Sequence, residues 1–358
     1  MGKILINGNF LCRSLTGIER FAWEICRELD TLLESGSGVS LYVPANAQDI
    51  PRYQNISILV SKKAVRSFPL WDMGTFAREC RRQKATGLNF SNTAPLGKAC
   101  GLAFIHDIYA KDCPQDFSSL REKLIMMYSR LSYWNIARNA QKILTVSEFS
   151  RRRIMEAYHV LSSRTEVIPN GWDHFACIKS DSSIFQKFPR LEKEAFYFTL
   201  GSLSKRKNIR WIAEYASARP QELFAISGKA ISGGFVPQEL RLLQELPNAV
   251  LLGYVTDGQV KALMEKCRAF VFPSYYEGFG IPPLEALSCK ARIIVSHSAS
   301  LPEIYGSAAS YINPASTDCR LEELLQDRSE SASAVLETYT YRNAALKLKK
   351  IIENEKKQ

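Results

Sequence analysis

Short apolar, β-branched runs alternate with amphipathic segments along almost the whole chain, and this alternation restricts the fold more than any other feature. In the first half the runs are KILINGN, SLYVP, ISILV, GLNFSN, GLAFIHD and KILTVS. In the second half they are FYFTLGS, LFAISG, AVLLGYV, AFVFPS, RIIVSHS and ASYINP. Strands that are separated by helices pair in parallel, and parallel sheets are covered by helices on both faces. The pattern therefore predicts an α/β protein with two Rossmann-like, doubly wound domains.

A polar stretch of weak periodicity, residues 179–194, separates the two series of strands. We expect an N-terminal domain over residues 1–172, a linker over 173–194, a C-terminal domain over 195–335, and a final helix over 336–358 that crosses back onto the first domain. A chain of 358 residues suits two domains, each of roughly 150 to 180 residues. Two such sheets that face one another enclose a cleft at the carboxyl ends of their strands, where doubly wound sheets bind ligands.

Several classes of protein are excluded by the composition and by absent patterns. The nine cysteines form no CxxC pair and no disulfide framework, which favours a reduced, cytoplasmic location. No run approaches the roughly 20 apolar residues that a membrane span needs, so we expect a protein that is soluble or peripheral. The phosphate-binding pattern GxxxxGK[ST] is missing, which argues against a kinase or an ATPase.

Positive charge is concentrated in the first half of the chain. Residues 1–172 carry 23 Lys and Arg against 15 Asp and Glu, a net charge of +8, whereas residues 173–358 carry 24 against 21, a net charge of +3. A basic half suits nucleic acid, anionic lipid or a phosphorylated substrate. Clusters such as Arg151, Arg152 and Arg153 fit a solvated helix face equally well.

Two glutamates stand eight residues apart in the stretch FVFPSYYEGFGIPPLEALSCK. The apolar run before them predicts a buried strand, and Pro282 and Pro283 suit the first turn of a helix that contains Glu285. A carboxylate near a helix N-terminus can accept hydrogen bonds from both hydroxyls of a ribose. Glu277 lies in the intervening loop, where a carboxylate can bind sugar hydroxyls. The alternative is a helix-capping Glu285 and a Glu277 that faces solvent.

A basic loop follows the first strand of the second series. Gly201 ends that strand, and Lys205, Arg206 and Lys207 precede a helix. Positive side chains together with the free amides of a helix N-terminus suit a diphosphate. Taken alone, the same three residues would fit a solvated patch.

The pattern EGFGIPPLEA resembles the E-x7-E signature of retaining glycosyltransferase family four (the group 1 glycosyltransferases), which has the glycosyltransferase B fold. Other segments resemble the same family in the same order: TGIER, FIHDIY, LTVSEFSRRRI, VIPNGWD, GSLSKRKNI and SLPEIYGSAASYINP. The similarity extends from about Gly17 to Pro314. It implies a nucleotide-sugar donor in the second domain and acceptor-side loops in the first.

The resemblance also implies the residues of the site. The catalytic residues that it implies are His106, Arg206, Lys207 and Glu277. The donor-binding residues that it implies are Gly17, Asp107, Gly201, Val255, Gly278, Phe279, Gly280, Ile281, Glu285 and Glu303. Gly278 and Gly280 let backbone amides approach a ligand closely.

Some of these residues have a second interpretation. A histidine at a strand end is often structural, but in this setting we expect His106 to contact the donor sugar. Asp107 could orient that imidazole or cap the next segment. Glu303 is expected at the start of a short helix, either as a helix-start carboxylate or as a donor contact. The backbone at Val255 is expected at the edge of the nucleobase.

The resemblance implies transfer of a sugar from a nucleoside diphosphate to a hydroxyl, with retained anomeric configuration and without a metal. GDP-mannose, a UDP-hexose and dTDP-rhamnose all fit as donors. We expect the acceptor to be a glycan or a lipid-linked oligosaccharide of a bacterial surface polysaccharide, such as an O-antigen or a capsule. We expect no nucleic acid partner, and an anionic membrane suits the basic first domain. The pattern specifies no oligomeric state.

Two other interpretations remain open. A catalytically silent nucleotide-sugar-binding scaffold would keep the fold, as would an epimerase or a phosphorylase. The scheme of retaining glycoside hydrolases, with two carboxylates about 5 to 5.5 Å apart, is rejected because Glu285 is assigned to the ribose.

Overall fold

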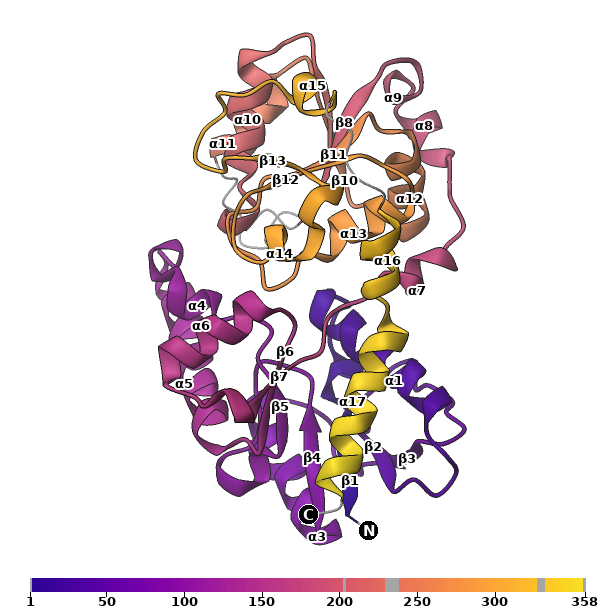
Figure 1. Ribbon diagram of the computed structural model, residues 1–358, viewed down its shortest axis with the longest axis vertical. Helices are drawn as coiled ribbons and strands as arrows, with labels where there is room; N and C mark the ends of the chain where they lie inside the picture. The colour runs from indigo at the N-terminus through magenta and orange to yellow at the C-terminus, as the bar shows by residue number, and fades with distance from the viewer. Residues whose placement is uncertain (1, 202–203, 229–237, 327–331, 357–358) are drawn as a thin grey trace. The chain divides into compact units, whose positions relative to one another are not determined.

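The computed structural model describes residues 2–201, 204–228, 238–326 and 332–356, which form two compact units. The first unit comprises Met1–Gly171 together with Tyr339–Gln358, and the second comprises Trp172–Thr338. Figure 1 shows that each unit has a parallel sheet with helices packed around it. The predicted fold class is thereby confirmed for each unit.

The first unit contains a seven-stranded sheet with the order β3-β2-β1-β4-β5-β6-β7. Its strands are β1 (Lys3–Asn7), β2 (Val39–Val43), β3 (Ser57–Val60), β4 (Ala85–Asn89), β5 (Leu102–Phe104), β6 (Lys142–Thr145) and β7 (Thr165–Val167). All neighbours pair in parallel. The strand order reverses between β1 and β4, which is the position where such sheets open a crevice for a ligand.

Helices of the first unit connect these strands. They are η1 (Gly8–Cys12), α1 (Gly17–Leu32), α2 (Phe68–Leu70), η2 (Trp71–Phe76), α3 (Ala77–Gln83), η3 (Gly97–Cys100), α4 (Tyr109–Asp112), η4 (Pro114–Asp116), α5 (Leu120–Asn139), α6 (Glu148–Tyr158), η5 (Ser162–Arg164) and α17 (Tyr341–Glu355). Ser147 caps α6, because its side chain accepts a hydrogen bond from the Ser150 amide at 3.1 Å.

The last helix, α17, packs on α1. Its buried residues follow the helical spacing i, i+3, i+4, i+7 and i+11, so that one face is apolar: Tyr341, Ala344, Ala345, Leu348 and Ile352. The ring of Tyr341 lies 6.2 Å from that of Phe21 in α1, measured between centroids. Lys349 Nζ donates to the carbonyl of Leu32 at 2.8 Å. The two ends of the chain therefore lie side by side in this unit (Figure 1).

The second unit contains a six-stranded parallel sheet with the order β10-β9-β8-β11-β12-β13. Its strands are β8 (Phe196–Leu200), β9 (Leu223–Ser227), β10 (Ala249–Gly253), β11 (Ala269–Phe272), β12 (Ile293–Ser296) and β13 (Ser310–Ile312). The order reverses between β8 and β11. Gly201 follows one of these strands and Pro273 the other, so the two loops expected from the sequence start at this reversal.

The helices of the second unit begin earlier in the chain than expected. They are α7 (Asp173–Ala176), α8 (Ser183–Lys187), α9 (Arg190–Lys193), η6 (Lys205–Lys207), α10 (Ile209–Ala218), α11 (Gln238–Glu245), α12 (Asp257–Lys266), α13 (Ile281–Ser288), α14 (Leu301–Tyr305), η7 (Gly306–Ala308), α15 (Leu321–Leu324) and α16 (Ser333–Thr338). Residues 173–194, expected as a linker, thus carry three short helices of this unit. None of the helices in the described ranges has the length and apolar content of a membrane span.

Candidate functional site

The loop after β11 carries Glu277 into contact with the basic loop after β8. Glu277 is only 5% exposed. Lys207 Nζ lies 2.7 Å from Glu277 Oε1, and Arg206 NH1 lies 3.4 Å from Glu277 Oε2. The amide of Tyr275 also donates to the carbonyl of Arg206 at 3.0 Å. Two segments that are 70 residues apart in the sequence therefore meet where the strand order reverses.

This cluster has more positive than negative charge. Burial alone would raise the pKa of Glu277, but the charges of Lys207 and Arg206 and the hydrogen bond from Lys207 hold that pKa below its ordinary value. Glu277 is therefore ionised at neutral pH. One carboxylate faces two cations, so the summed charge of these three side chains is positive, which favours an anionic group nearby.

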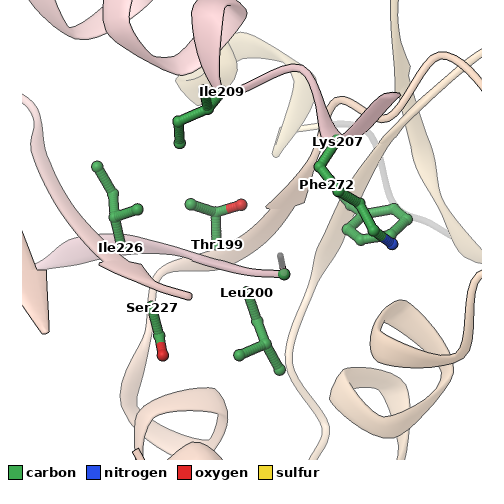
Figure 2. A pocket seen from close by; sticks show the side chains of 8 residues that line it. Thr199, Leu200, Lys207, Ile209, Ile226, Ser227 and Phe272 are labelled. Atoms are coloured by element: carbon green, nitrogen blue, oxygen red, sulfur yellow. The ribbon is translucent and has the colours of Figure 1, made fainter. Parts of the chain in front are cut away.

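Lys207 is held along the strand ends by close packing. A Cβ added at Gly201 would lie 3.4 Å from Lys207 Cδ, so glycine lets the lysine stem pass closely. The Lys207 ammonium lies 4.6 Å from the centroid of the Phe272 ring. Figure 2 shows the two side chains beside each other. A cavity of about 20 Å³ adjoins these residues and the ends of β8 and β9. Such a cavity holds about one water molecule.

Three serines hold the loop that carries Glu277 by hydrogen bonds. Ser296 is the last residue of β12, and Ser298 and Ser300 follow it. Ser300 Oγ donates to the carbonyls of Glu277 and Phe279 at 3.0 and 3.2 Å. Ser298 Oγ donates to the carbonyl of Tyr275 at 2.7 Å. Ser296 Oγ donates to that of Ser274. The three serines stand in the pattern SHSAS, but Ser298 and Ser300 lie in a bend and a turn beyond β12, so strand alternation could not have revealed the series.

The Gly-Phe-Gly turn ends at the start of α13. Gly280 has φ +89°, a left-handed conformation that favours glycine, and a Cβ there would lie 2.6 Å from Leu301 Cδ2. The Tyr305 hydroxyl donates to the carbonyl of Gly280. Gly278 and Phe279 are buried, and Ile281 begins α13, followed by the two prolines as expected.

Glu285 lies on α13 with a partner that the sequence did not indicate. Its Oε1 lies 3.0 Å from His174 Nε2 of α7, and both side chains are buried. The two residues are 111 positions apart in the sequence. No local pattern predicts this contact. His174 therefore restricts the orientation of the carboxylate that we assigned to the ribose.

Val255 and Glu303 are two further residues that were expected to bind the donor. Val255 follows β10 and has a buried side chain. Strands β9 and β8 separate β10 from β11, so the structure does not place Val255 beside Glu277. Glu303 is exposed in the first turn of α14, as expected. It shares that short helix with Tyr305.

In the first unit, His106 lies just beyond β5 in an aromatic cluster. Its ring lies 5.2 Å from that of Phe21 and 5.5 Å from that of Phe104, between centroids. Nε2 lies 2.7 Å from the carbonyl of Phe90, and a carbonyl can only accept, so Nε2 carries the proton. Burial lowers the pKa of His106, against the opposing effects of that carbonyl, Asp107 and Glu19. The neutral ring then has Nδ1 as its acceptor.

The other two expected residues of the first unit lie at helix starts. Asp107 Oδ1 accepts a hydrogen bond from the Tyr109 amide at 3.0 Å, so that it caps the segment leading into α4. This contact matches the second interpretation of Asp107. Gly17 is exposed at the first position of α1.

Sequence reasoning missed a pocket of about 360 Å³ in the first unit. It lies between η1, the start of α1 and the segment after β2, and its lining includes Phe10, Arg13, Arg20, Trp23, Glu24 and Gln48. The guanidinium of Arg13 stacks 3.8 Å over the Phe68 ring. Aromatic rings beside charged and amide groups suit a ligand with both apolar and hydroxyl surfaces.

A buried polar network at the strand reversal of this unit was also missed. Asp72 Oδ1 accepts hydrogen bonds from the side chains of Asn7 and Asn9, both at 2.8 Å, and Oδ2 accepts one from Thr93 at 2.9 Å. Asn7 also donates to Asn89 Oδ1 at 3.1 Å. In the described ranges, no three His, Cys, Asp or Glu side chains gather into a metal-binding group.

Two family models match the sequence, one in each half. The model described as Glycosyltransferase Family 4 matches residues 15–174, and the model described as Glycosyl transferases group 1 matches residues 180–342. Together they span both units.

Several of the similar curated proteins are bacterial mannosyltransferases. The sequence is 30% identical over 236 residues to the O-antigen chain mannosyltransferase B of Escherichia coli, which covers 63% of this chain and 61% of that protein. It is 27% identical over 183 residues to a serotype-specific mannosyltransferase of the same organism, covering 49% of this chain and 22% of that protein. The chain therefore spans less than two thirds of the length of each of these relatives.

Similar solved structures share the fold across almost the whole chain. A sucrose-phosphate synthase from Thermosynechococcus elongatus superposes with a TM-score of 0.71 at 14% identity, covering 99% of both chains. The Anabaena protein HepE, solved in complex with UDP and glucose, superposes with a TM-score of 0.68 at 15% identity, covering 99% of this chain and 100% of that chain.

Proposed function

Because the chain belongs to the family of group 1, or family 4, glycosyltransferases, we propose that it transfers a hexose from a nucleoside-diphosphate sugar to a hydroxyl of a bacterial surface polysaccharide. The observation that supports this most is the buried Glu277 between Arg206 and Lys207 at the strand reversal of the second unit. The named activity of the similar mannosyltransferases favours mannose as the sugar, and hence GDP-mannose among the three expected donors.

The proposed reaction retains the anomeric configuration. The acceptor oxygen forms its bond to the anomeric carbon on the face from which the diphosphate departs, and a phosphate oxygen of the leaving group takes the acceptor proton. Arg206 and Lys207 stabilise the negative charge that develops on the diphosphate. In this proposal the two side chains supply the positive charge, and no metal takes part.

The other residues hold the reactants. Glu285, oriented by His174, binds the ribose hydroxyls of the donor. The first unit supplies His106, whose Nδ1 accepts a hydrogen bond from a sugar hydroxyl. The pocket beside Trp23 receives the acceptor glycan, since its aromatic and charged lining suits a sugar. We also propose a lipid-linked acceptor and peripheral contact with an anionic membrane.

A ligand panel followed by a transfer assay tests the proposal. The full chain is heated with GDP-mannose, UDP-glucose, UDP-galactose or dTDP-rhamnose, and the stabilising donor raises Tm because it binds only the folded state. That donor is then incubated with isolated O-antigen glycans. Nuclear magnetic resonance of the product should show the anomeric configuration of the donor. Binding without nucleotide release would indicate a silent scaffold, and inverted product would refute the retaining mechanism.

A further inference from the structure

Helix α5 presents a row of large apolar side chains to solvent. The row consists of Leu120, Leu124, Met127, Leu131 and Trp134, which we call the α5 stripe. These side chains are between 52% and 77% exposed. Their spacing of four and three residues places them on one face of the helix. A contiguous exposed apolar surface of this kind marks an interaction site rather than a scattered surface residue.

The α5 stripe is separate from the face that holds the helix in the fold. Tyr133, Ile136 and Ala137 are buried and belong to the apolar core formed with Ile143 of β6. The helix begins with a capping box between Ser119 and Glu122. One face of α5 is therefore packed in the core. The α5 stripe lies on another face, which is exposed, so core packing does not explain its apolar residues.

Positive charges accompany the stripe along its length. The charged residues of α5 are Arg121, Lys123, Arg130 and Arg138, with Glu122 as the one acid. The Arg138 guanidinium lies 5.7 Å from the Trp134 ring centroid. A neighbouring loop adds the exposed Leu96 and Lys98, and Asn135 of α5 fastens that loop by donating to the carbonyl of Pro95 at 3.1 Å.

We propose that the α5 stripe and its flanking cations dock the first unit on an anionic lipid bilayer. Apolar side chains beside Lys and Arg match the acyl and phosphate layers of a membrane interface. A second copy of the chain fits less well, because cations stand at both ends of the stripe, so that stripe-to-stripe packing in either direction brings like charges together. This inference names the surface for the membrane contact of the proposed function.

Vesicle flotation with the full chain tests this surface without any sugar transfer. The wild type should float with vesicles of equal parts phosphatidylglycerol and phosphatidylcholine. The variant Leu124→Ser/Leu131→Ser should bind them roughly tenfold or more weakly, because two apolar anchors are lost. Leu346→Ser, which changes an exposed leucine of α17, is the matched control and should bind like the wild type. Equal Tm values verify that the variants fold.

A charge variant separates the two parts of the surface. Lys123→Gln/Arg130→Gln should weaken binding to the anionic vesicles and reduce its dependence on salt concentration, with little effect on phosphatidylcholine alone. Sugar transfer to a soluble glycan should be unchanged in all these variants, so that docking and catalysis can fail separately. Wild-type protein that does not float would overturn the inference. So would a dimer in sedimentation that the Leu124→Ser/Leu131→Ser variant dissociates.

Discussion

The hydroxyl of Ser300 donates a hydrogen bond to the backbone carbonyl of Glu277 at 3.0 Å. The same hydroxyl reaches the carbonyl of Phe279, so one side chain fixes both ends of the turn that carries the glutamate. The side chain of Glu277 is held separately by Lys207. The position of the carboxylate thus depends on both its backbone and its charge partners.

Ser300→Ala should lower the free energy of unfolding by about 1 to 3 kcal/mol, because two buried carbonyls lose their donor. We also expect weaker donor binding, since the turn is no longer fixed. Chemical denaturation and calorimetric titration with the donor measure the two effects. Ser129→Ala is the control, because that exposed hydroxyl bonds only to the carbonyl of Ile125 in its own helix. Equal effects of the two substitutions would contradict the role of Ser300.

Lys207→Ala should reduce turnover by roughly 10²-fold or more, because a cation that stabilises the departing diphosphate is lost. Initial rates of nucleotide release, measured at saturating donor, report this effect. Lys205→Ala provides a matched control, since Lys205 is an exposed lysine of the same short helix. If Lys207→Ala were as active as Lys205→Ala, Lys207 would not be the residue that stabilises the departing diphosphate.

His174→Leu should weaken donor binding through Glu285, because the buried carboxylate loses the ring that orients it. Glu285→Gln should weaken binding directly by mismatching the ribose hydroxyls. The double variant should lose less free energy of donor binding than the sum of the losses in the two single variants. The difference is the interaction energy, about 0.5 to 3 kcal/mol. Dissociation constants from calorimetry close this double-mutant cycle. Losses that simply add would show that His174 does not act through Glu285.

The stability of the protein should fall as the pH drops below about 6.5, partly because of His106. Burial lowers the pKa of His106 in the folded protein, whereas the unfolded chain titrates near 6.5. The unfolded state therefore binds more protons in acid, and the stability present above pH 6.5 is lost as the pH falls toward the folded-state pKa.

Replacement of His106 should flatten this dependence. Urea unfolding of His106→Leu between pH 7.5 and 5 should give a shallower slope than the wild type. The matched control is His159→Asn, an exposed histidine with φ +53°, a conformation that asparagine tolerates. An unchanged slope in His106→Leu would exclude this histidine as the source.

Long periodic segments made the fold predictable from the sequence. The apolar runs KILTVS and FYFTLGS, for example, contain the strands β6 and β8. Strand β7 was not predicted, because Thr165–Val167 has only three residues, one of them charged, and gives no alternation to detect. Residues 179–194 showed weak periodicity for a similar reason, since their helices α8 and α9 have only five and four residues.

The candidate site was predictable only where its residues stand in local patterns. The loops of Lys207 and Glu277 could be recognised separately, and in the structure the two side chains are in contact. The bond between His174 and Glu285 depends on how α7 packs against α13, which no local spacing records. The hydrogen bonds of Asp72 with Asn7 and Thr93 likewise arise from tertiary packing.

The return of α17 to α1 makes the first unit discontinuous in the chain, with its last helix encoded after the whole second unit. During synthesis the second unit emerges complete while the first still lacks Tyr341, one of the rings that pack on Phe21. The part of α1 that α17 covers is then exposed until α17 has been synthesised. A nonsense mutation or a stalled ribosome before Tyr341 would leave a nascent product whose amino-terminal half is the part that chaperones must shield.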